Sequence, residues 1–232
     1  MEIFLDTSSL GEIERWLRHG VIDGVTTNPS IMLKDGHRDL EAGSKEIAAL
    51  ITPRPVSVEV ITNDLDEMVF QAREFASWAS NIVIKIPITN EDGEPCLEVI
   101  KTLEGEGIRV NCTACMSFGQ AVLASKAGAT YVSLFGGRIS DEGHDASRVI
   151  KMTREWLDLW GYKSKIIVGS IREVINIQDA AVAGAHVITI PPRFMAKMVD
   201  HKYTRYTVGQ FVRDGGRAFA QLEKIGLQKA RA

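Results

Sequence analysis

Short runs of apolar and β-branched residues recur along the chain, and each is followed by a stretch with the period of an amphipathic helix. This alternation is typical of parallel strands joined by helices. Most runs are apolar nearly throughout, as expected of strands that are covered on both faces. Eight such runs are present, near residues 3–5, 24–27, 56–60, 81–86, 108–113, 130–135, 165–170 and 186–190.

The segment after the first run shows how a helix is specified. Ser9 and Glu12 have the spacing of a capping box, in which two side chains accept hydrogen bonds from backbone amides at the helix start. Similar apolar stripes occupy residues 65–75 and 149–157. In the segment that begins at Ser9, the apolar residues fall on one face and end before Gly20. They are Leu10, Ile13, Trp16 and Leu17.

Eight strands with single helices between them favour a closed barrel over an open doubly wound sheet, which has fewer strands. We therefore predict an α/β fold, a (β/α)8 TIM barrel that forms a single domain over residues 1–232, with an additional C-terminal helix over about 203–232. Gly215-Gly216 is expected to interrupt this helix, which we expect to contact a neighbouring subunit. Its apolar residues at roughly helical spacing are Val208, Phe211, Val212, Phe219 and Leu222.

Composition narrows the function classes. The 232 residues are 45% hydrophobic, and 27 basic residues stand against 30 acidic ones, so a sequence-independent nucleic-acid binder is excluded. The first 30 residues lack the pattern of a secretory signal, and no run is long enough to span a membrane. Three cysteines are an odd and small number, which favours a reducing compartment. We expect a cytoplasmic protein with neither nucleic-acid nor membrane partners.

Polar residues stand where most of the predicted strands end. In a parallel barrel the carboxyl ends of the strands surround the active site, so these side chains are expected to meet in one place. They are Asp6, Thr27, Asn28, Glu59, Lys85, Asn111, Thr113, Ser133, Arg138, Ser170 and Arg172.

Lys85 lies within the apolar run Ile82–Pro87, where an unpaired ammonium would be costly to desolvate. Burial favours the uncharged amine, which can attack a ketone and form an imine that withdraws electrons during aldol cleavage. Such chemistry also needs acids and bases within reach, which Asp6 and Glu59 would supply. The alternative is that Lys85 forms only a buried ion pair with one of these carboxylates, and that Asp6 only begins a helix.

Arg138, Ser170 and Arg172 are predicted to bind a phosphate, because guanidinium groups, a hydroxyl and a helix amino end all favour a dianion. Gly136-Gly137 would let the backbone turn toward the ligand. For Arg172 a purely solvated arginine is the alternative.

Other patterns point to no chemistry. Cys112 and Cys115 form a C-x-x-C, but no second pair follows, and strand positions three apart point to opposite faces. The five histidines lack the spacing of metal ligands, and no Walker A or G-x-G-x-x-G motif is present. We therefore predict neither a metal nor a nucleotide.

Seven stretches carry a family resemblance: FLDT (4–7), DGVTTNPS (23–30), VSVEV (56–60), VIKIPIT (83–89), NCT (111–113), AGATYVSLFGGR (127–138) and GSIR (169–172). Together they resemble the short microbial-type transaldolases and the closely related fructose-6-phosphate aldolases. The resemblance covers nearly the whole predicted barrel. It implies a class I Schiff-base mechanism without metal or organic cofactor, in a homo-oligomer of five or ten chains.

The resemblance also implies roles for individual residues. Lys85 matches the imine lysine, Asp6 the acid/base that acts on the C4 hydroxyl, and Glu59 with Thr113 the pair that holds a proton-shuttling water. Thr27 lies in the same matching stretch and is a further candidate for substrate binding. Asn28, Asn111 and Ser133 match the dihydroxyacetone site, and Arg138, Ser170 and Arg172 match the phosphate site.

Two positions favour transfer over release. Free aldolases of the family tend to carry glutamine and tyrosine where this chain has Glu59 and Phe135. A phenyl ring cannot protonate the dihydroxyacetone carbanion, so the intermediate waits for an aldehyde acceptor. We therefore expect a transaldolase of the pentose phosphate pathway, a transferase in carbohydrate metabolism, which moves dihydroxyacetone from sedoheptulose 7-phosphate or fructose 6-phosphate to an aldose phosphate.

Three alternatives stay open. The first is a lyase that releases dihydroxyacetone, and the second is a transaldolase for a ketose with another terminal anion, such as a sulfonate. The third is a catalytically silent barrel that binds sugar phosphates. The last two derive from departures from the family pattern, at residues 114–117, Leu134, Gly136 and 191–193.

Overall fold

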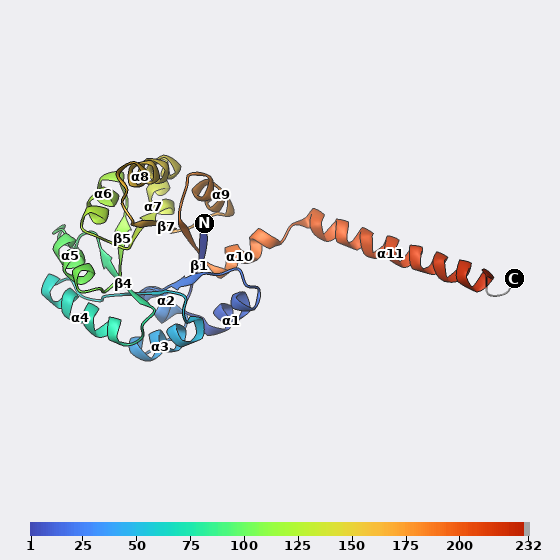
Figure 1. The fold of residues 1–232 in the computed structure, drawn as a ribbon, viewed down its shortest axis with the longest axis horizontal. Helices are drawn as coiled ribbons and strands as arrows, with labels where there is room; N and C mark the ends of the chain where they lie inside the picture. The colour runs from blue at the N-terminus through green and yellow to red at the C-terminus, as the bar shows by residue number, and fades with distance from the viewer. Residues whose placement is uncertain (230–232) are drawn as a thin grey trace. The chain divides into compact units, whose positions relative to one another are not determined.

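A computed structural model of the chain describes residues 1–229, with every side chain except those of residues 222 and 224–229. Its parallel strands close into a barrel in sequence order, with β8 paired to β1 (Figure 1). The predicted (β/α)8 barrel is therefore confirmed. The strands are β1 (Glu2–Asp6), β2 (Gly24–Thr26), β3 (Val56–Glu59), β4 (Ile82–Pro87), β5 (Val110–Cys115), β6 (Tyr131–Phe135), β7 (Lys165–Gly169) and β8 (Val187–Ile190).

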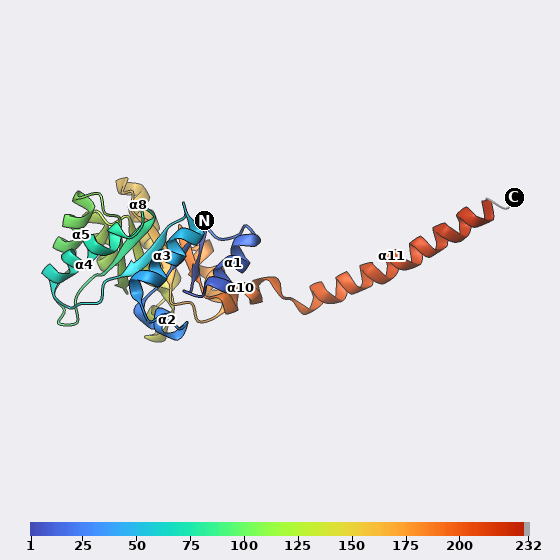
Figure 2. The same cartoon turned by 90° about the horizontal axis from the view of Figure 1, so that it is seen from below.

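The described chain divides into two compact units, Met1–Pro192 and Arg193–Ala232. The first unit holds all the strands and the helices that lie outside them (Figure 2). The second unit holds most of α10 (Pro192–Val199) and all of α11 (Lys202–Lys229). The helices of the first unit are α1 (Leu10–Arg18), α2 (Pro29–Lys34), α3 (Leu40–Ile51), α4 (Leu65–Ser77), α5 (Leu97–Gly105), α6 (Phe118–Lys126), α7 (Gly136–Asp141), α8 (Ala146–Trp160) and α9 (Val174–Val182).

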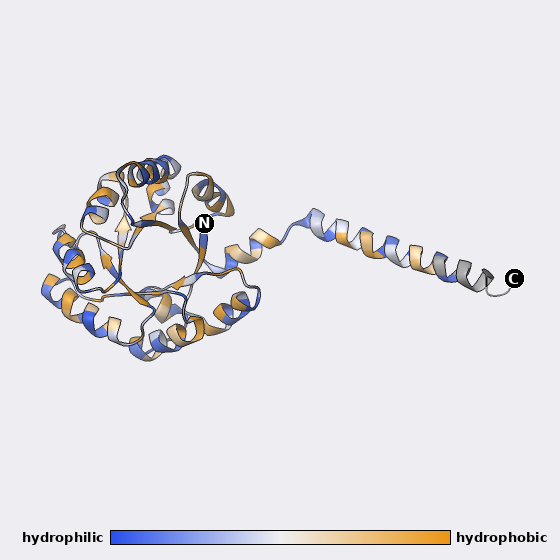
Figure 3. Ribbon diagram, viewed as in Figure 1, coloured by the Kyte–Doolittle hydropathy of each residue, from blue (hydrophilic) through white to orange (hydrophobic). Residues whose placement is uncertain are grey.

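The strands are apolar because both of their faces are covered, whereas the helices alternate apolar and polar residues (Figure 3). Five side chains from strands on different sides of the barrel pack together and are buried. We call this cluster the barrel plug, and its members are Phe4, Val83, Tyr131, Ile167 and Val187. Burying a side chain of this size contributes about 1.5–3 kcal/mol.

The start of α1 differs from the sequence prediction. Ser9 is the N-cap, but its side chain makes no capping hydrogen bond. Glu12 instead accepts a hydrogen bond from the indole nitrogen of Trp16, at 3.2 Å. The predicted capping box is therefore wrong, because the glutamate is engaged one turn further along the helix. Within the predicted apolar stripe, Ile13 and Trp16 are buried.

The stripe predicted in α8 is also only partly right. Ile150 and Leu157 are buried, but Met152 is 39% exposed. Thr153 takes the inner face instead, since its hydroxyl donates to the Val149 carbonyl at 2.8 Å and is satisfied without water.

In the second unit, α11 runs without a break through Gly215 and Gly216. The predicted interruption is wrong, because glycine lowers helix propensity by about 1 kcal/mol without removing a backbone hydrogen bond. Val208, Phe211 and Phe219 are exposed on this helix. The side chain of Leu222 and residues 230–232 lie outside the described part of the chain. No helix within the described residues is long and apolar enough to cross a membrane.

Candidate active site

The strands build the site by alternation. Residues two apart on a strand share a face, so a side chain two positions beyond the barrel plug also points into the barrel, nearer its carboxyl end. Phe4 is followed in this way by Asp6, and Val83 by Lys85. The remaining plug residues place Ser133, Gly169 and Thr189 in the same layer. A layer of buried side chains thus lies beneath a layer of residues at the barrel mouth, most of them polar.

These groups enclose a cavity of about 180 Å³ at the carboxyl ends of the strands. Ten of the twelve site residues predicted from the sequence line it, and the structure therefore brings them together. The lining residues are Asp6, Thr26, Asn28, Lys85, Asn111, Thr113, Ser133, Phe135, Arg138, Gly169, Ser170, Arg172 and Thr189.

Lys85 is already engaged in the resting structure. Its Nζ donates to Glu59 Oε2 at 2.8 Å and to the Thr27 carbonyl at 2.9 Å. The lysine side chain is 8% exposed and the glutamate side chain 23%. The ammonium of Lys85 is therefore paired with Glu59, as the alternative of a buried ion pair predicts. A proton has to leave before the nitrogen can act as a nucleophile, and Glu59 is in place to accept it.

Thr27 and Thr113 differ in what they offer the cavity. The Thr27 hydroxyl donates to the Ser57 carbonyl at 2.8 Å, so this residue reaches Lys85 through its main chain. Among the described side chains, Thr113 Oγ1 is one of two buried oxygen atoms without a hydrogen-bond partner. A buried hydroxyl without a partner is unfavourable by itself, which indicates a position for a water or a ligand group.

A chain of hydrogen bonds orients the amide of Asn111. Ser133 Oγ donates to Asn111 Oδ1 at 2.7 Å, and Asn111 Nδ2 donates to Ser57 Oγ at 3.2 Å. All three residues are buried. Asn28 is held differently, because its Oδ1 caps α2 by accepting from the Ile31 amide at 2.9 Å. The two amide groups therefore present fixed polar atoms.

The arginines lie at the other end of the cavity. The Arg138 guanidinium stands over the Phe135 ring at 5.6 Å, and Arg172 Nη2 donates to Asp141 Oδ2 at 2.8 Å. A Cβ atom on Gly137 would come within 1.9 Å of the Ser170 carbonyl oxygen, so only glycine fits there. This end offers two cations and a hydroxyl to an anion.

Two backbone amides just before α9 are already occupied. Asn176 Oδ1 accepts hydrogen bonds from the amides of Arg172 and Glu173, at 3.1 and 2.9 Å. A side chain of the same helix therefore already satisfies these two amides, and the binding of a phosphate at the helix amino end stays a prediction.

The loop after Asp6 is anchored by Asp35. One carboxylate oxygen of Asp35 accepts from the Thr7 hydroxyl and from the amide and hydroxyl of Ser8, at 2.9 to 3.0 Å. Burial alone would raise the pKa of Asp35, but these hydrogen bonds outweigh it and hold the pKa below its ordinary value. The loop that follows Asp6 is thereby tied to the end of α2.

The sequence reasoning missed Thr26 and Thr189. Thr26 Oγ1 donates to Asp6 Oδ1 at 2.8 Å and lies 2.5 Å from Thr189 Oγ1. Both hydroxyls are buried. Threonine is common in strands for reasons unrelated to chemistry, so the residue type gave no signal. The alternation of each strand would have found them, since they face the barrel interior.

The orientation of Cys112 and Cys115 differs from the sequence prediction. Their sulfur atoms lie 3.7 Å apart, because a β-bulge shifts the register of β5 and Ala114 adopts a positive φ of 58°. The prediction that they point to opposite faces is wrong. The hydrogen bond with Cys115, together with burial, raises the pKa of Cys112 well above its ordinary value. Nowhere in the described part of the chain do three His, Cys, Asp or Glu side chains come together to hold a metal.

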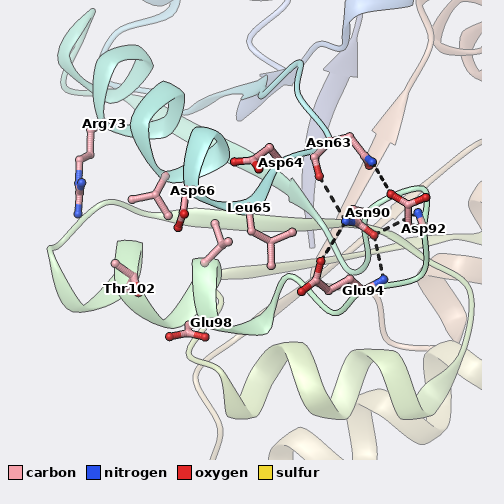
Figure 4. Close-up of a pocket in the computed structure, with 12 residues that line it drawn as sticks. Asn63, Asp64, Leu65, Asp66, Arg73, Asn90, Asp92, Glu94, Glu98 and Thr102 are labelled. Atoms are coloured by element: carbon pink, nitrogen blue, oxygen red, sulfur yellow. Dashed lines mark hydrogen bonds between the residues drawn. The ribbon is translucent and has the colours of Figure 1, made fainter.

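A larger groove of about 960 Å³ lies between α4 and α5, outside the barrel (Figure 4). Its polar groups bond mainly to one another. Asn63 Nδ2 donates to Asp92 Oδ2 at 2.8 Å, and Asn90 Oδ1 accepts from the Glu94 amide at 2.8 Å. The groove lacks a lysine with an adjacent base, so the smaller cavity in the barrel mouth is the candidate active site.

The fold and the site define a (β/α)8 barrel protein with an amine–carboxylate pair at its mouth and an anion site beside it. The sequence pattern of the Transaldolase/Fructose-6-phosphate aldolase family matches residues 3–231, and the chain belongs to this family. It is therefore an enzyme of the transaldolase or aldolase kind.

The sequences of two relatives match this chain over almost its whole length. A "Probable transaldolase" of Lactiplantibacillus plantarum is 42% identical over 97% of this chain and 100% of its own. A "Probable transaldolase 2" of Listeria monocytogenes is 44% identical over 96% of this chain and 99% of its own.

Solved structures support the fold alone. One described as "Native KDPGal structure" has a TM-score of 0.57 at 17% identity and covers 81% of this chain and 80% of its own. A thiamine phosphate pyrophosphorylase from Pyrococcus furiosus has a TM-score of 0.56 at 13% identity, with 82% and 85% covered.

Proposed function

We propose that the protein is a transaldolase, which transfers a dihydroxyacetone unit from a ketose phosphate to an aldose phosphate through a Schiff base on Lys85. The observation that carries the proposal is the hydrogen bond from Lys85 Nζ to Glu59, because Lys85 lines a cavity together with Asp6 and two arginines. A nucleophile, a base to activate it, a second acid/base and an anion site are the groups that this reaction requires.

In the proposed reaction, Lys85 first gives a proton to Glu59. The neutral nitrogen adds to the C2 carbonyl of the ketose, and the carbinolamine loses water to give the imine. A water between Glu59 and Thr113 carries the protons of this step, in keeping with the Thr113 hydroxyl that lacks a protein partner. The amide groups of Asn28 and Asn111 and the hydroxyl of Ser133 would hold the ketol hydroxyls.

Asp6 then accepts the proton of the C4 hydroxyl. The C3–C4 bond breaks, its electron pair moves toward the imine, and an enamine stays on Lys85 while the aldose phosphate leaves. The enamine attacks the aldehyde of the acceptor, Asp6 returns the proton to the new hydroxyl, and water releases the product ketose. Arg138, Ser170 and Arg172 would bind the phosphate of the donor and of the acceptor.

Transfer is favoured over release because Phe135 lines the cavity where a proton donor could otherwise stand. A phenyl ring has no acidic proton, so the enamine persists until an aldehyde arrives. Incubation with fructose 6-phosphate alone tests this point. Rapid release of glyceraldehyde 3-phosphate without an acceptor would favour a lyase.

The Schiff base is tested by borohydride reduction in the presence of fructose 6-phosphate, followed by peptide mass analysis. We expect an adduct on Lys85, and for Lys85→Met no adduct and a loss of activity of at least about a thousandfold. Lys165→Met is the matched control, since Lys165 also pairs with a glutamate from a strand, Glu2, at 2.6 Å but lies at the other end of the barrel.

An active Lys85→Met variant would contradict the Schiff base on Lys85. If the parent protein binds sugar phosphates but forms no adduct and turns nothing over, the silent-barrel alternative replaces the proposal. The remaining alternative is a transaldolase for a ketose that ends in another anion. It is tested by comparing kcat/KM for donors that end in a sulfonate with kcat/KM for their phosphate counterparts, and a higher value for the sulfonates would support it.

We further propose the setting that the family resemblance implies. The protein acts in the cytoplasm on small sugar phosphates, within the pentose phosphate pathway, without metal or organic cofactor. It forms a homo-oligomer of five or ten chains. The exposed aromatic residues Phe211 and Phe219 of α11 support the assembly, because they share this helix with other exposed apolar side chains and a partner usually covers such a surface.

A further inference from the structure

Two threonines connect β8 to the carboxylate of Asp6. Thr26 Oγ1 lies 2.8 Å from Asp6 Oδ1 and 2.5 Å from Thr189 Oγ1. Thr26 pairs with Asp6 across β2 and β1, whereas Thr189 comes from β8, on the other side of β1. Both threonines line the candidate active site, and both are less than 7% exposed.

The single proton of each hydroxyl determines the direction of this chain. A carboxylate only accepts, so the Thr26 hydroxyl has to donate its one proton to Asp6. The contact between the two threonines then needs its proton from Thr189. The Thr189 proton therefore points toward Thr26 and the Thr26 proton toward Asp6, and the Thr26 hydroxyl cannot turn away without losing its hydrogen bond to Asp6.

The neighbouring strand β7 leaves room for the Thr189 side chain. A Cβ atom on Gly169 would lie 3.3 Å from the Thr189 methyl group. Gly169 thus leaves just enough room for this methyl group, and the Thr189 hydroxyl is directed to Thr26. A larger residue at Gly169 would displace it.

We propose that Thr189 is a positioning residue for Asp6. It acts through Thr26, whose hydroxyl it locks toward the carboxylate, and so keeps Asp6 oriented to accept the proton of the C4 hydroxyl. This inference rests on the proposed function, and it assigns Thr189 to the bond-breaking step alone. In the proposed reaction the water between Glu59 and Thr113, and not Asp6, carries the protons during formation of the imine. This step is therefore expected to be independent of Thr189.

Thr189→Val tests the inference, because valine keeps the shape of threonine and removes only the hydroxyl. We expect kcat for transfer from fructose 6-phosphate to fall about tenfold, the loss expected for one hydrogen bond in a charged network, with KM changed by less than about twofold. The rate at which borohydride traps dihydroxyacetone on Lys85 stays at the parental value, since this adduct forms without breaking a carbon–carbon bond. Thr189→Ser keeps the hydroxyl, so its kcat is expected to stay within about threefold of the parental value.

Thr153→Val is the matched control, as it removes a buried threonine hydroxyl from α8 that does not line the cavity, and it is expected to leave kcat unchanged. Melting curves establish that each variant is folded, and Thr189→Ala takes the place of the valine variant if that one is not. A parental kcat in Thr189→Val overturns the inference, as does a trapping rate that falls in parallel with kcat. A parent protein without any adduct overturns the proposed function as well, so the two failures are distinguishable.

Discussion

Side chains two positions apart on one strand have different surroundings in this barrel. Val83 lies in the barrel plug, whereas Lys85 stands about 6.6 Å further along β4, among polar groups at the mouth. The same step separates Phe4 from Asp6. An amine or a carboxylate is stable at the second position because partners are available there, and Lys85 has Glu59 at 2.8 Å.

Gly137 provides a prediction at this scale. Gly137→Ala would place a methyl group 1.9 Å from the Ser170 carbonyl oxygen and 2.8 Å from Arg172 Cγ, so the segment that carries both residues has to move. We expect KM for phosphorylated donors to rise at least about tenfold, since displaced anion contacts no longer align. Steady-state kinetics with fructose 6-phosphate measure this effect.

Gly119→Ala is the control for that variant. Gly119 lies in α6 with nothing within 4 Å of an added Cβ, so alanine is expected to leave KM unchanged and to stabilise the helix by up to about 1 kcal/mol. Equal KM values in Gly137→Ala and the parent would show that this segment does not bind the substrate phosphate.

Elements are specified partly by local sequence and partly by their neighbours. The apolar runs predict every strand, and the strand bounds differ from the prediction by only a few residues. The bulge in β5 was not predictable, because it depends on how Cys112 and Cys115 pair with β6. The continuity of α11 across Gly215 and Gly216 was also missed, since propensity is only a weak prior for a long helix.

Helix capping gives a prediction at the element scale. Ser9 has a favourable cap residue type but makes no side-chain bond, whereas Asp64 Oδ1 accepts from the Glu67 amide at 2.8 Å at the start of α4. We expect Ser9→Ala to change the free energy of unfolding by less than about 0.5 kcal/mol, and Asp64→Ala to lower it by about 1 kcal/mol. Urea unfolding of both variants measures the difference, and a larger loss in Ser9→Ala would contradict the observed geometry.

At the scale of the whole molecule, the chain comprises a barrel unit and a helical unit that exposes aromatic residues. Phe211 is 68% exposed and Phe219 is 72% exposed, and both lie on α11. Val208 and Val212 are exposed on the same helix, and several large apolar side chains on one helix indicate a surface that another surface covers. The proposed homo-oligomer accounts for it.

The proposed assembly predicts that Phe211→Asp combined with Phe219→Asp lowers the mass of the particle in solution. Sedimentation velocity or light scattering after size exclusion measures this mass. Phe70→Asp is the matched control, since Phe70 is 62% exposed on α4 of the barrel unit and is expected to leave the mass unchanged. A parent protein that is monomeric at all concentrations would contradict the assembly.

The sequence by itself determined the barrel, its strand order and most of the residues at its mouth. It could do so because doubly covered strands are apolar, so a lysine or a glutamate within such a run is conspicuous. Only the tertiary structure decided how these residues are paired. The bond between Lys85 and Glu59 and the fit of Gly137 beside Ser170 depend on how neighbouring strands pair, and the chain from Thr189 to Asp6 joins β8 to the first strands of the chain. Strand register sets the first two distances and barrel closure sets the third, and no local pattern of residues encodes them.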